Sequence, residues 1–380
     1  MSVSNLRARG ACLTGDSDIS LTDVIPMALG AVAPSLPFAR PDLARRLALP
    51  SADAVVVILV DGLGLIPLQD HLGHARTLRA FRDSIEAAYS VVPSTTAAGI
   101  TACGTGQLSG QTRMVGYSVF HGEQIFNLLA FTDGIDPAHW QQCPTYFEKL
   151  RDLGVPSATI LPAKFAGSGL TTAALRGAHF VPATRWEERC DAAVTELKQG
   201  SKLVYLYWSD IDACGHSYGT DSTQWSEALE DFDAGLGRFL SRIPSGVRVL
   251  LTADHGMVNI DFSQILDVAQ TPALREGVRV VAGETRAVHV HCERGEDPER
   301  VQDRWENFLD EQAWVVGPSE LAELMGEGPG LAETGDFVAF SRGRAGIVDS
   351  RTQSAAAMSL TGVHGSLTQE EMLIPLIPLA

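Results

Sequence analysis

Three largely apolar runs constrain most strongly what this chain can fold into, because each run ends abruptly at acidic residues. The runs are Ala54–Val60, Lys202–Trp208 and Val247–Thr252, and the acids that follow them are Asp61, Asp210 with Asp212, and Asp254. Continuous apolar runs of this length are typical of strands buried on both faces of a parallel sheet. Open α/β sheets bind ligands in the crevice at the C-terminal ends of their strands. We therefore expect these acids to converge at one edge of a sheet.

Helical patterns between the runs predict that strands and helices alternate along the chain. The clearest pattern is Trp225–Ile243, which lies between the second and third runs. Alternation of this kind is typical of sheets covered by helices. The predicted fold class is α/β, with a mainly parallel central sheet flanked by helices.

A stretch in the C-terminal third departs from this order. Val278–Val281, Ala287–Cys292 and Phe337–Phe340 resemble short strands, and an amphipathic helix is expected near Pro298–Gln312. The stretch lacks the core's pattern of a strand followed by an acid. We expect a small α+β insertion or cap at residues 271–349, with residues 1–270 and 350–380 forming the core.

The charge balance of the chain excludes one class of partner. The 380 residues include 29 Lys and Arg against 46 Asp and Glu, which gives a formal net charge of −17. No Lys/Arg cluster offers the footprint that binding to a phosphate backbone requires. We therefore predict that no nucleic acid polymer is a partner.

The chain also carries no pattern of membrane insertion or secretion. No run reaches the roughly 20 apolar residues of a spanning helix, and acids and prolines interrupt the N-terminal stretch, unlike a signal peptide. The six cysteines are scattered without a CxxC pair, which favours free thiols in a reducing compartment. We expect a cytoplasmic protein without a membrane partner.

Four short motifs supply residue types that bind divalent metals. The candidate ligands are Asp61, Asp212, His216, Asp254, His255 and His364. Asp212 and His216 are four residues apart, so they share a helical face or flank a tight glycine turn, and either geometry can chelate one ion. Three carboxylates and three imidazoles suffice for two Zn²⁺-like ions. The sequence therefore predicts a dinuclear site.

A segment rich in hydroxyl groups precedes a helix of small residues. Pro93-Ser94-Thr95-Thr96 leads into the small-residue stretch 97–106. A hydroxyl is therefore expected at a helix N-terminus, where free N–H groups favour an anionic phosphoryl group. A hydroxyl is a poor nucleophile near neutral pH unless a base or a metal lowers its pKa, and the predicted metals could do so.

Each of these residues also has a simpler structural interpretation. Asp61 can cap the turn after its strand, Asp212 and His216 can form a solvated pair on a helix, and Thr96 can be a helix N-cap, a position that favours Ser and Thr. None of these roles explains why the acids all follow buried apolar strands.

Taken together and in order, the motifs resemble the alkaline phosphatase superfamily and, within it, the type I phosphodiesterase/nucleotide pyrophosphatase branch. The motifs are Val60-Asp61-Gly62, Pro93-Ser94-Thr95-Thr96 with Thr105-Gly106, Asp212-x-x-Gly215-His216, Thr252-Ala253-Asp254-His255-Gly256 and Gly362-Val363-His364-Gly365. They cover most of the chain, and five motifs in register are far more specific than any one alone.

The resemblance implies roles for individual residues. Asp212, His216 and His364 would hold one zinc ion, and Asp61, Asp254, His255 and the nucleophile would hold the other. The implied nucleophile is Thr96, with Thr95 as the alternative, because the distance from Thr96 to Thr105-Gly106 matches the family's nucleophile helix. The implied reaction is in-line attack by Thr96, a covalent phospho-threonine intermediate and hydrolysis by water. The expected cofactors are two divalent ions, Zn²⁺ with Mn²⁺ as the alternative.

One position departs from the family pattern. Many members carry an Asn three residues after the nucleophile, where its amide contacts a phosphoryl oxygen, whereas this chain has Gly99. The backbone N–H of Ala97 would then contact that oxygen, so Ala97 and Gly99 are the candidate substrate-binding positions.

The resemblance implies a metal-dependent phosphodiesterase or nucleotide pyrophosphatase that acts on a small phosphate ester or nucleotide. A phosphomonoesterase or phosphonate hydrolase on the same scaffold is the alternative, because the metal ligands do not set the leaving group. A catalytically silent binding protein with the same fold is a further alternative.

Overall fold

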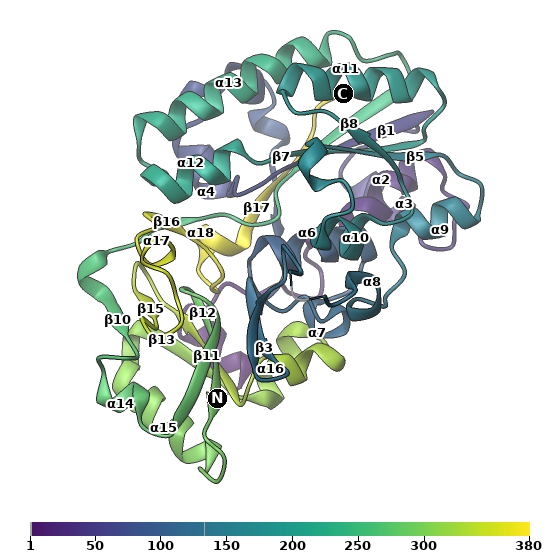
Figure 1. Ribbon diagram of the computed structural model, residues 1–380. Coiled ribbons are helices and arrows are strands. Elements are labelled where there is room, and N and C mark those ends of the chain that lie inside the picture. Colours follow the sequence, from purple (N-terminus) through teal and green to yellow (C-terminus); the bar gives the residue numbers. More distant parts are fainter. Residues whose placement is uncertain (1, 133) are drawn as a thin grey trace.

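A seven-stranded sheet organises the protein, whose computed structural model describes residues 2–132 and 134–380 (Figure 1). The strands run in the order β2-β17-β8-β1-β7-β5-β6. Their bounds are β1 Ala54–Val60, β2 Glu86–Tyr89, β5 Ser157–Leu161, β6 His179–Pro182, β7 Leu203–Trp208, β8 Val247–Thr252 and β17 Leu373–Pro378. β1 is parallel to β7 and β8, and β5 is parallel to β6 and β7, whereas β17 is antiparallel to β2 and β8. The predicted mainly parallel sheet is confirmed.

The three apolar runs form the centre of this sheet. β1 and β8 match the predicted runs residue for residue, and β7 begins one residue later than predicted. Every residue of β1 and β7 is buried, as expected for strands covered on both faces.

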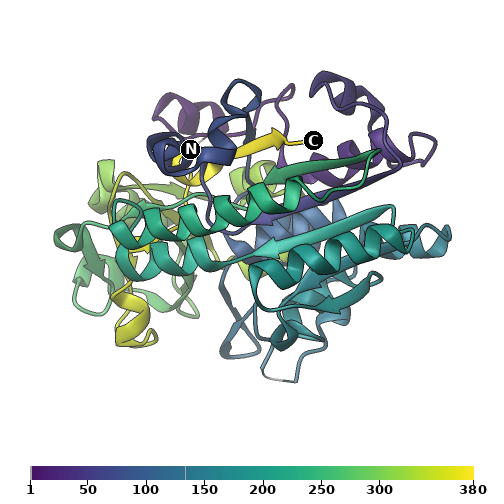
Figure 2. The same ribbon diagram turned by 90° about the horizontal axis from the view of Figure 1, so that it is seen from above.

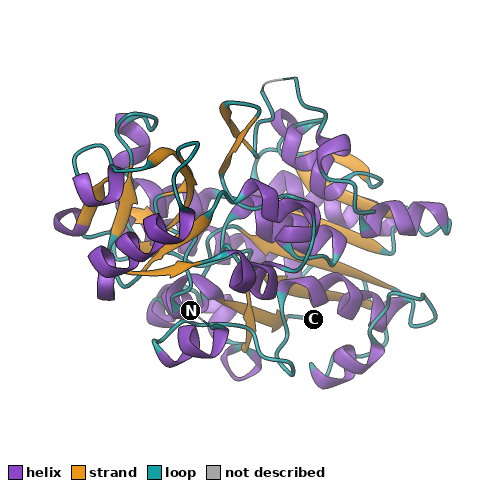
Figure 3. Ribbon diagram, turned by 90° about the horizontal axis from the view of Figure 1, so that it is seen from below, coloured by secondary structure: helices purple, strands orange, loops and turns teal. Residues whose placement is uncertain are grey.

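Helices cover both faces of the sheet (Figures 1, 2 and 3). They are α1 Val3–Ala8, α2 Val24–Val32, α3 Pro41–Arg46, α4 Leu65–Asp70, α5 Arg76–Arg79, α6 Thr96–Thr105, α7 Ser109–Thr112, α8 Pro137–Trp140, α9 Tyr146–Asp152, α10 Gly169–Leu175, α11 Trp186–Lys198, α12 Asp210–Tyr218, α13 Thr223–Leu240, α17 Ala355–Met358 and α18 Gln369–Met372. Successive strand residues point to opposite faces. In β7, Trp208 packs on Trp186 of α11, whereas Tyr205 packs on Phe147 of α9. The two helices therefore lie on opposite faces.

A second sheet lies beside the first and is antiparallel, with the order β11-β12-β14-β13 (Figure 1). Its strands are β11 Val278–Glu284, β12 Ala287–Cys292, β13 Ala313–Val316 and β14 Phe337–Ser341, and the helices in this part are α14 Pro272–Arg275, α15 Pro298–Leu309 and α16 Pro318–Met325. β11 runs three residues beyond its predicted end, to Glu284. The sheet lies within the stretch 271–349 for which the sequence predicts an insertion, and those domain boundaries stay a prediction.

The two faces of this second sheet bury different partners. Trp314 and Phe340 join an apolar cluster that includes Met114 from the core. Ala339, next in sequence to Phe340, joins a separate cluster with Trp305 of α15. One face of the second sheet therefore packs on the core, and the other is covered by its own helix.

Three two-stranded ladders complete the part of the fold that the structure describes. They are β3 Ser118–His121 with β4 Gln124–Asn127, β9 Val258–Asn259 with β16 Gly362–Val363, and β10 Ile265–Asp267 with β15 Gly346–Val348. The β9–β16 ladder joins the segment after β8 to the segment that contains His364. Among the described residues, no helix is both long enough and apolar enough to cross a membrane.

Candidate metal centre and active site

The predicted acids lie together at one edge of the main sheet. Asp61 directly follows β1, Asp254 follows β8 after one intervening residue, and Asp212 lies in the first turn of α12, just after β7. These three strands are parallel neighbours, so their C-terminal ends meet at the same edge. The β9–β16 ladder adds His364 from the far end of the chain.

Asp61, Asp254 and His255 form one group of candidate ligands. One ligand atom of each lies within 4.8 Å of the others. The Nε2 atom of His255 lies 3.4 Å from Oδ1 of Asp61 and 3.7 Å from Oδ2 of Asp254. All three residues are buried, so their side chains are held in place by packing.

Asp212, His216 and His364 form a second group, again within 4.8 Å. His216 Nε2 lies 3.3 Å from Asp212 Oδ2, and His364 Nε2 lies 3.9 Å from Asp212 Oδ1. The rings of His255 and His364 stack with centroids 3.7 Å apart, so the two groups adjoin. This is the partition that the resemblance implies, and the ligand roles themselves stay a prediction.

The three imidazoles are all oriented by backbone carbonyl groups. The Nδ1 atoms of His216, His255 and His364 lie 2.8, 2.9 and 3.1 Å from the carbonyl oxygens of Gly362, Gly256 and Ser94, respectively. In the tautomer that this pattern favours, Nδ1 donates its proton to the carbonyl and Nε2 keeps its lone pair. Backbone acceptors commonly orient metal-binding histidines in this way.

The carboxylates fit divalent ions. Asp61 Oδ1, Asp212 Oδ1 and Asp254 Oδ2 are buried and have no hydrogen-bond partner in the described part of the chain. Buried polar atoms are usually satisfied, and leaving a charged one unpaired is costly. Each candidate aspartate therefore offers one oxygen that a cation would satisfy, and the mixed oxygen and nitrogen set suits Zn²⁺ or Mn²⁺.

Electrostatics in the site also favour bound cations. Burial and the neighbouring charges of Asp254 and Asp212 raise the pKa of Asp61 well above its usual range, although the hydroxyl of Tyr207 donates to Asp61 Oδ2 and opposes this shift. Burial, together with the neighbouring imidazoles of His255 and His216, lowers the pKa of His364 well below its usual range. The imidazole of His364 is therefore neutral, which is the form that binds a metal.

The two candidate nucleophiles point to different partners. Thr96 is the first residue of α6, and its Oγ1 lies 3.1 Å from Nε2 of His255. Thr95 instead donates its hydroxyl proton to Oε2 of Glu284 at 2.7 Å. The hydroxyl of Thr96 therefore faces the metal groups and that of Thr95 does not. Ala97, the second residue of α6, is buried, and its N–H has no acceptor within the helix.

Gly99 lies against Asp254 in the structure. A Cβ atom at position 99 would lie 2.9 Å from the Cβ of Asp254 and 3.0 Å from its carbonyl oxygen. These distances are shorter than ordinary van der Waals contact, so an Asn side chain has no room in this conformation. Gly99 thus allows α6 to pack closely against the loop after β8, and its role in substrate binding stays a prediction.

Glu284 is a site residue that the sequence reasoning missed, and only 11% of its side chain is exposed. It ends β11 of the second sheet, and its carboxylate lies 3.8 Å from Nδ1 of His364. Burial is the main cause that raises the pKa of Glu284 to about 8. The expectation that this stretch lacks the strand-then-acid pattern is therefore wrong, because β11 extends past its predicted end and finishes at the acid Glu284.

A buried ion pair between Arg286 and Glu371 was also missed. Arg286 donates from Nε to Oε1 of Glu371 at 3.0 Å and from Nη2 to Oε2 at 2.7 Å. Glu371 Oε1 also accepts the N–H of Ser366, two residues after His364, and the Glu371 carbonyl accepts the N–H of Gly256, next to His255. The ion pair therefore ties the second sheet to both histidine loops.

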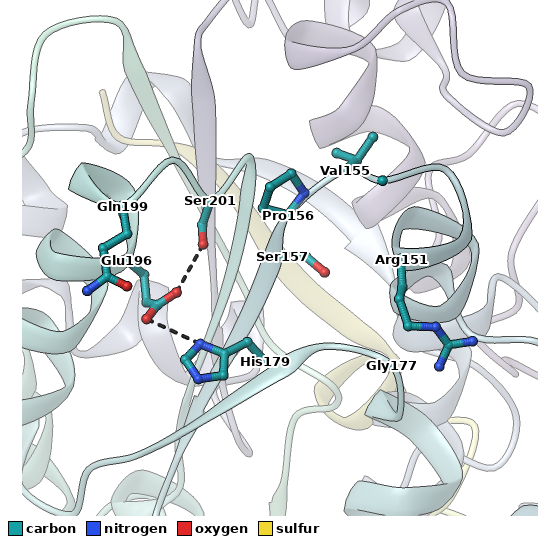
Figure 4. A pocket seen from close by; sticks show the side chains of 10 residues that line it. Arg151, Val155, Pro156, Ser157, Gly177, His179, Glu196, Gln199 and Ser201 are labelled. Carbon is teal, nitrogen blue, oxygen red and sulfur yellow. Dashed lines mark hydrogen bonds and ion pairs between the residues drawn. The ribbon is translucent and has the colours of Figure 1, made fainter.

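A pocket of about 390 Å³ lies at the opposite edge of the main sheet (Figure 4). Ser157 and His179, the first residues of β5 and β6, help to line it, whereas the candidate site lies beyond the C-terminal ends of the strands. Glu196 in this pocket already accepts a hydrogen bond from Ser201 at 3.0 Å and lies 3.3 Å from His179. None of the candidate ligands lines it.

Known proteins resemble this chain over short stretches of sequence and over most of the fold. Bis(5'-adenosyl)-triphosphatase ENPP4 from Bos taurus is 27% identical over 99 residues, which are 24% of this chain and 22% of that protein. Human ectonucleotide pyrophosphatase/phosphodiesterase family member 5 is 28% identical over 78 residues, which are 19% of this chain and 16% of that protein. The chain thus matches about a fifth of the length of these curated relatives.

The fold of this chain is similar to the folds of solved structures. Phosphonoacetate hydrolase from Sinorhizobium meliloti 1021, in complex with phosphonoformate, has a TM-score of 0.70 and 17% identity, covering 87% of this chain and 91% of that one. Murine ectonucleotide pyrophosphatase/phosphodiesterase 5 has a TM-score of 0.66 and 17% identity, covering 86% and 88%. The sequence profile of the type I phosphodiesterase/nucleotide pyrophosphatase family matches residues 55–365. The chain therefore belongs to this family, within the alkaline phosphatase superfamily.

Proposed function

We propose that this protein is a hydrolase that cleaves phosphodiester or phosphoanhydride bonds in a small phosphate ester or nucleotide, and that it does so with two bound divalent ions. The observation that carries the proposal is the position of Thr96 Oγ1, 3.1 Å from His255 and beside two groups of ligands with unpartnered buried oxygens. Family membership supports the class of bond. A solved complex of AMP with an inactive threonine-to-alanine variant of the murine relative supports the choice of a threonine and of a nucleotide.

The chain's own groups account for the proposed steps. When bound, two divalent ions would neutralise phosphoryl charge and lower the pKa of a hydroxyl and of a water molecule. Thr96 loses its proton to solvent, and its oxygen bonds to phosphorus while the leaving group departs with the electron pair of the broken bond and takes up a proton from solvent. The N–H of Ala97 is placed to donate to a phosphoryl oxygen. Water then bonds to phosphorus and releases a proton, the bond to Thr96 breaks with its electron pair on the Thr96 oxygen, and that oxygen takes up a proton to restore the hydroxyl.

Replacing the nucleophile tests this proposal. Thr96→Ala removes the attacking oxygen, so we expect turnover of bis-p-nitrophenyl phosphate to fall by several orders of magnitude, while elemental analysis still finds two metal ions per chain. Thr96→Ser, the matched control, keeps a hydroxyl and should keep measurable turnover. Full activity of Thr96→Ala would refute the assignment.

The leaving group separates the proposed activity from its alternative. A phosphodiesterase cleaves bis-p-nitrophenyl phosphate faster than p-nitrophenyl phosphate, and equal or reversed preference would favour a phosphomonoesterase. The likeness in fold to a phosphonoacetate hydrolase makes phosphonoacetate the third substrate of the panel. Hydrolysis of phosphonoacetate alone would favour a phosphonate hydrolase.

A further inference from the structure

We propose that Glu284 is a positioning residue of this active site, because it holds the Thr95 hydroxyl away from the start of α6 and so leaves the first N–H groups of that helix free for the phosphoryl group. This inference rests on the proposed function. It assigns a role at the site to the second sheet, which contributes none of the six candidate metal ligands.

Thr95 has the backbone of a helix cap but does not cap with its side chain. Its φ of −140° and ψ of 152° place it at the N-cap of α6, yet no side-chain cap hydrogen bond forms. A threonine at this position ordinarily accepts a hydrogen bond from the second or third N–H of the helix. Here its hydroxyl donates to Oε2 of Glu284 at 2.7 Å instead. The carboxyl group of Glu284 has therefore diverted the capping hydroxyl.

The start of α6 is left open as a result. The N–H of Gly99 bonds to the carbonyl of Thr95 at 2.8 Å, but throughout the described chain the N–H groups of Ala97 and Ala98 have no protein acceptor. Free N–H groups at a helix N-terminus attract anions. Thr96 lies at the same end and faces the metal groups, so a phosphoryl group attacked by Thr96 would be within reach of these donors.

Packing holds Glu284 in this orientation. The residue ends β11, and the space beside it is filled, because a Cβ atom added to Gly365 would lie 2.9 Å from its Cγ and Cδ atoms. His364 lies on the same side, with Nδ1 3.8 Å from Oε2. Among the described residues, Oε1 makes no hydrogen bond of ordinary geometry, although the backbone N–H of Tyr117 acts on this carboxyl group and opposes the rise of its pKa. Oε2 accepts the proton of Thr95.

Without this acceptor, the Thr95 hydroxyl is free to rotate about χ1 and to accept an N–H of α6. It would then compete with the phosphoryl group for the same donors. The known strength of N-cap hydrogen bonds corresponds to a loss of about 2- to 30-fold in affinity for phosphate.

The experiment is a double-mutant cycle on the full-length, zinc-loaded protein, with inorganic phosphate as the ligand and isothermal titration calorimetry as the readout. Glu284→Met removes the acceptor but keeps a long side chain that fills the buried space. Thr95→Val keeps the β-branched shape of threonine and cannot cap. Thermal unfolding of each variant without metal checks that it is folded.

The expected result is a coupling between the two positions. Glu284→Met weakens phosphate binding about 2- to 30-fold when Thr95 is present, and by less than about twofold in the Thr95→Val background. Glu284→Gln, whose amide oxygen can still accept the Thr95 proton, recovers most of the affinity. Loss of a merely structural residue would weaken binding equally in both backgrounds.

Other outcomes overturn the inference. Equal losses in the two backgrounds, or no loss in either, would show that Glu284 does not act through Thr95, while the proposed hydrolase activity of the wild-type protein would stand. Absence of both phosphate binding and hydrolysis in the zinc-loaded wild-type protein would overturn the proposed function together with this inference.

Discussion

Breaking the buried ion pair between Arg286 and Glu371 should cost a large part of the protein's stability. Both side chains are fully buried, and Arg286 also donates to the carbonyl of Ala345. Removing one partner of such a pair typically costs about 3–5 kcal/mol, because the other charge stays buried without its partner. In Arg286→Met, Glu371 would keep two donors, the N–H of Ser366 and the hydroxyl of Thr368. We therefore expect the lower end of the range, about 3 kcal/mol.

Urea unfolding of the metal-free protein, followed by circular dichroism, measures this loss. The matched control is Arg238→Met, which breaks an ion pair with Glu187 whose side chains are 60% and 61% exposed. That variant should lose less than about 1 kcal/mol. Adding Glu371→Gln to Arg286→Met removes the unpaired charge and should restore part of the stability. A loss below about 1 kcal/mol for Arg286→Met would refute the reasoning.

Three further predictions concern the metal groups. Gly99→Ala places a methyl group 2.9 Å from the Cβ of Asp254, so it should weaken the binding of zinc. A competition titration with a chromogenic chelator measures this affinity, and an unchanged affinity would contradict the close packing. In the metal-free protein, the folded state raises the pKa of Asp61 above its ordinary value of 3.8. The folded state thus keeps a proton that the unfolded state loses, so the free energy of unfolding falls as pH rises above about 4. Asp61→Asn should make the dependence of this free energy on pH less steep in urea titrations. An unchanged dependence on pH would argue against the raised pKa. His364→Ala removes one of the three ligands of its group, so elemental analysis should find close to one zinc per chain, whereas two would exclude His364 as an essential ligand.

The central sheet and the convergence of the ligands could be predicted because both follow from local pattern. β1 is buried along its whole length and β8 is buried except at Arg248, so their sequences are largely apolar runs with sharp ends. Parallel neighbours end at the same edge, which places Asp61 and Asp254 together without any knowledge of side-chain packing. The motif around His364 could be read in the same way, although only the β9–β16 ladder brings it to that edge.

The close packing of Gly99 could not be predicted from the sequence, for a physical reason. The sequence gives its distance along α6 from Thr96, but the direction in which position 99 points depends on how α6 packs on the loop after β8. That packing brings Gly99 against Asp254. The segment that a helical residue contacts depends on how the helix is rotated about its axis relative to the neighbouring elements. The spacing of residues within one segment does not specify this rotation.

The sequence by itself determined the alternating architecture, the residue types of the metal site and the family, because these depend on hydrophobic periodicity and on short motifs in order. Only the tertiary structure decided which threonine faces the metal groups, that Glu284 diverts the hydroxyl of Thr95, and that Arg286 ties the second sheet to Glu371. These contacts join residues up to 189 positions apart. Each contact depends on how segments distant in the sequence pack against one another, so no local pattern in either segment encodes it.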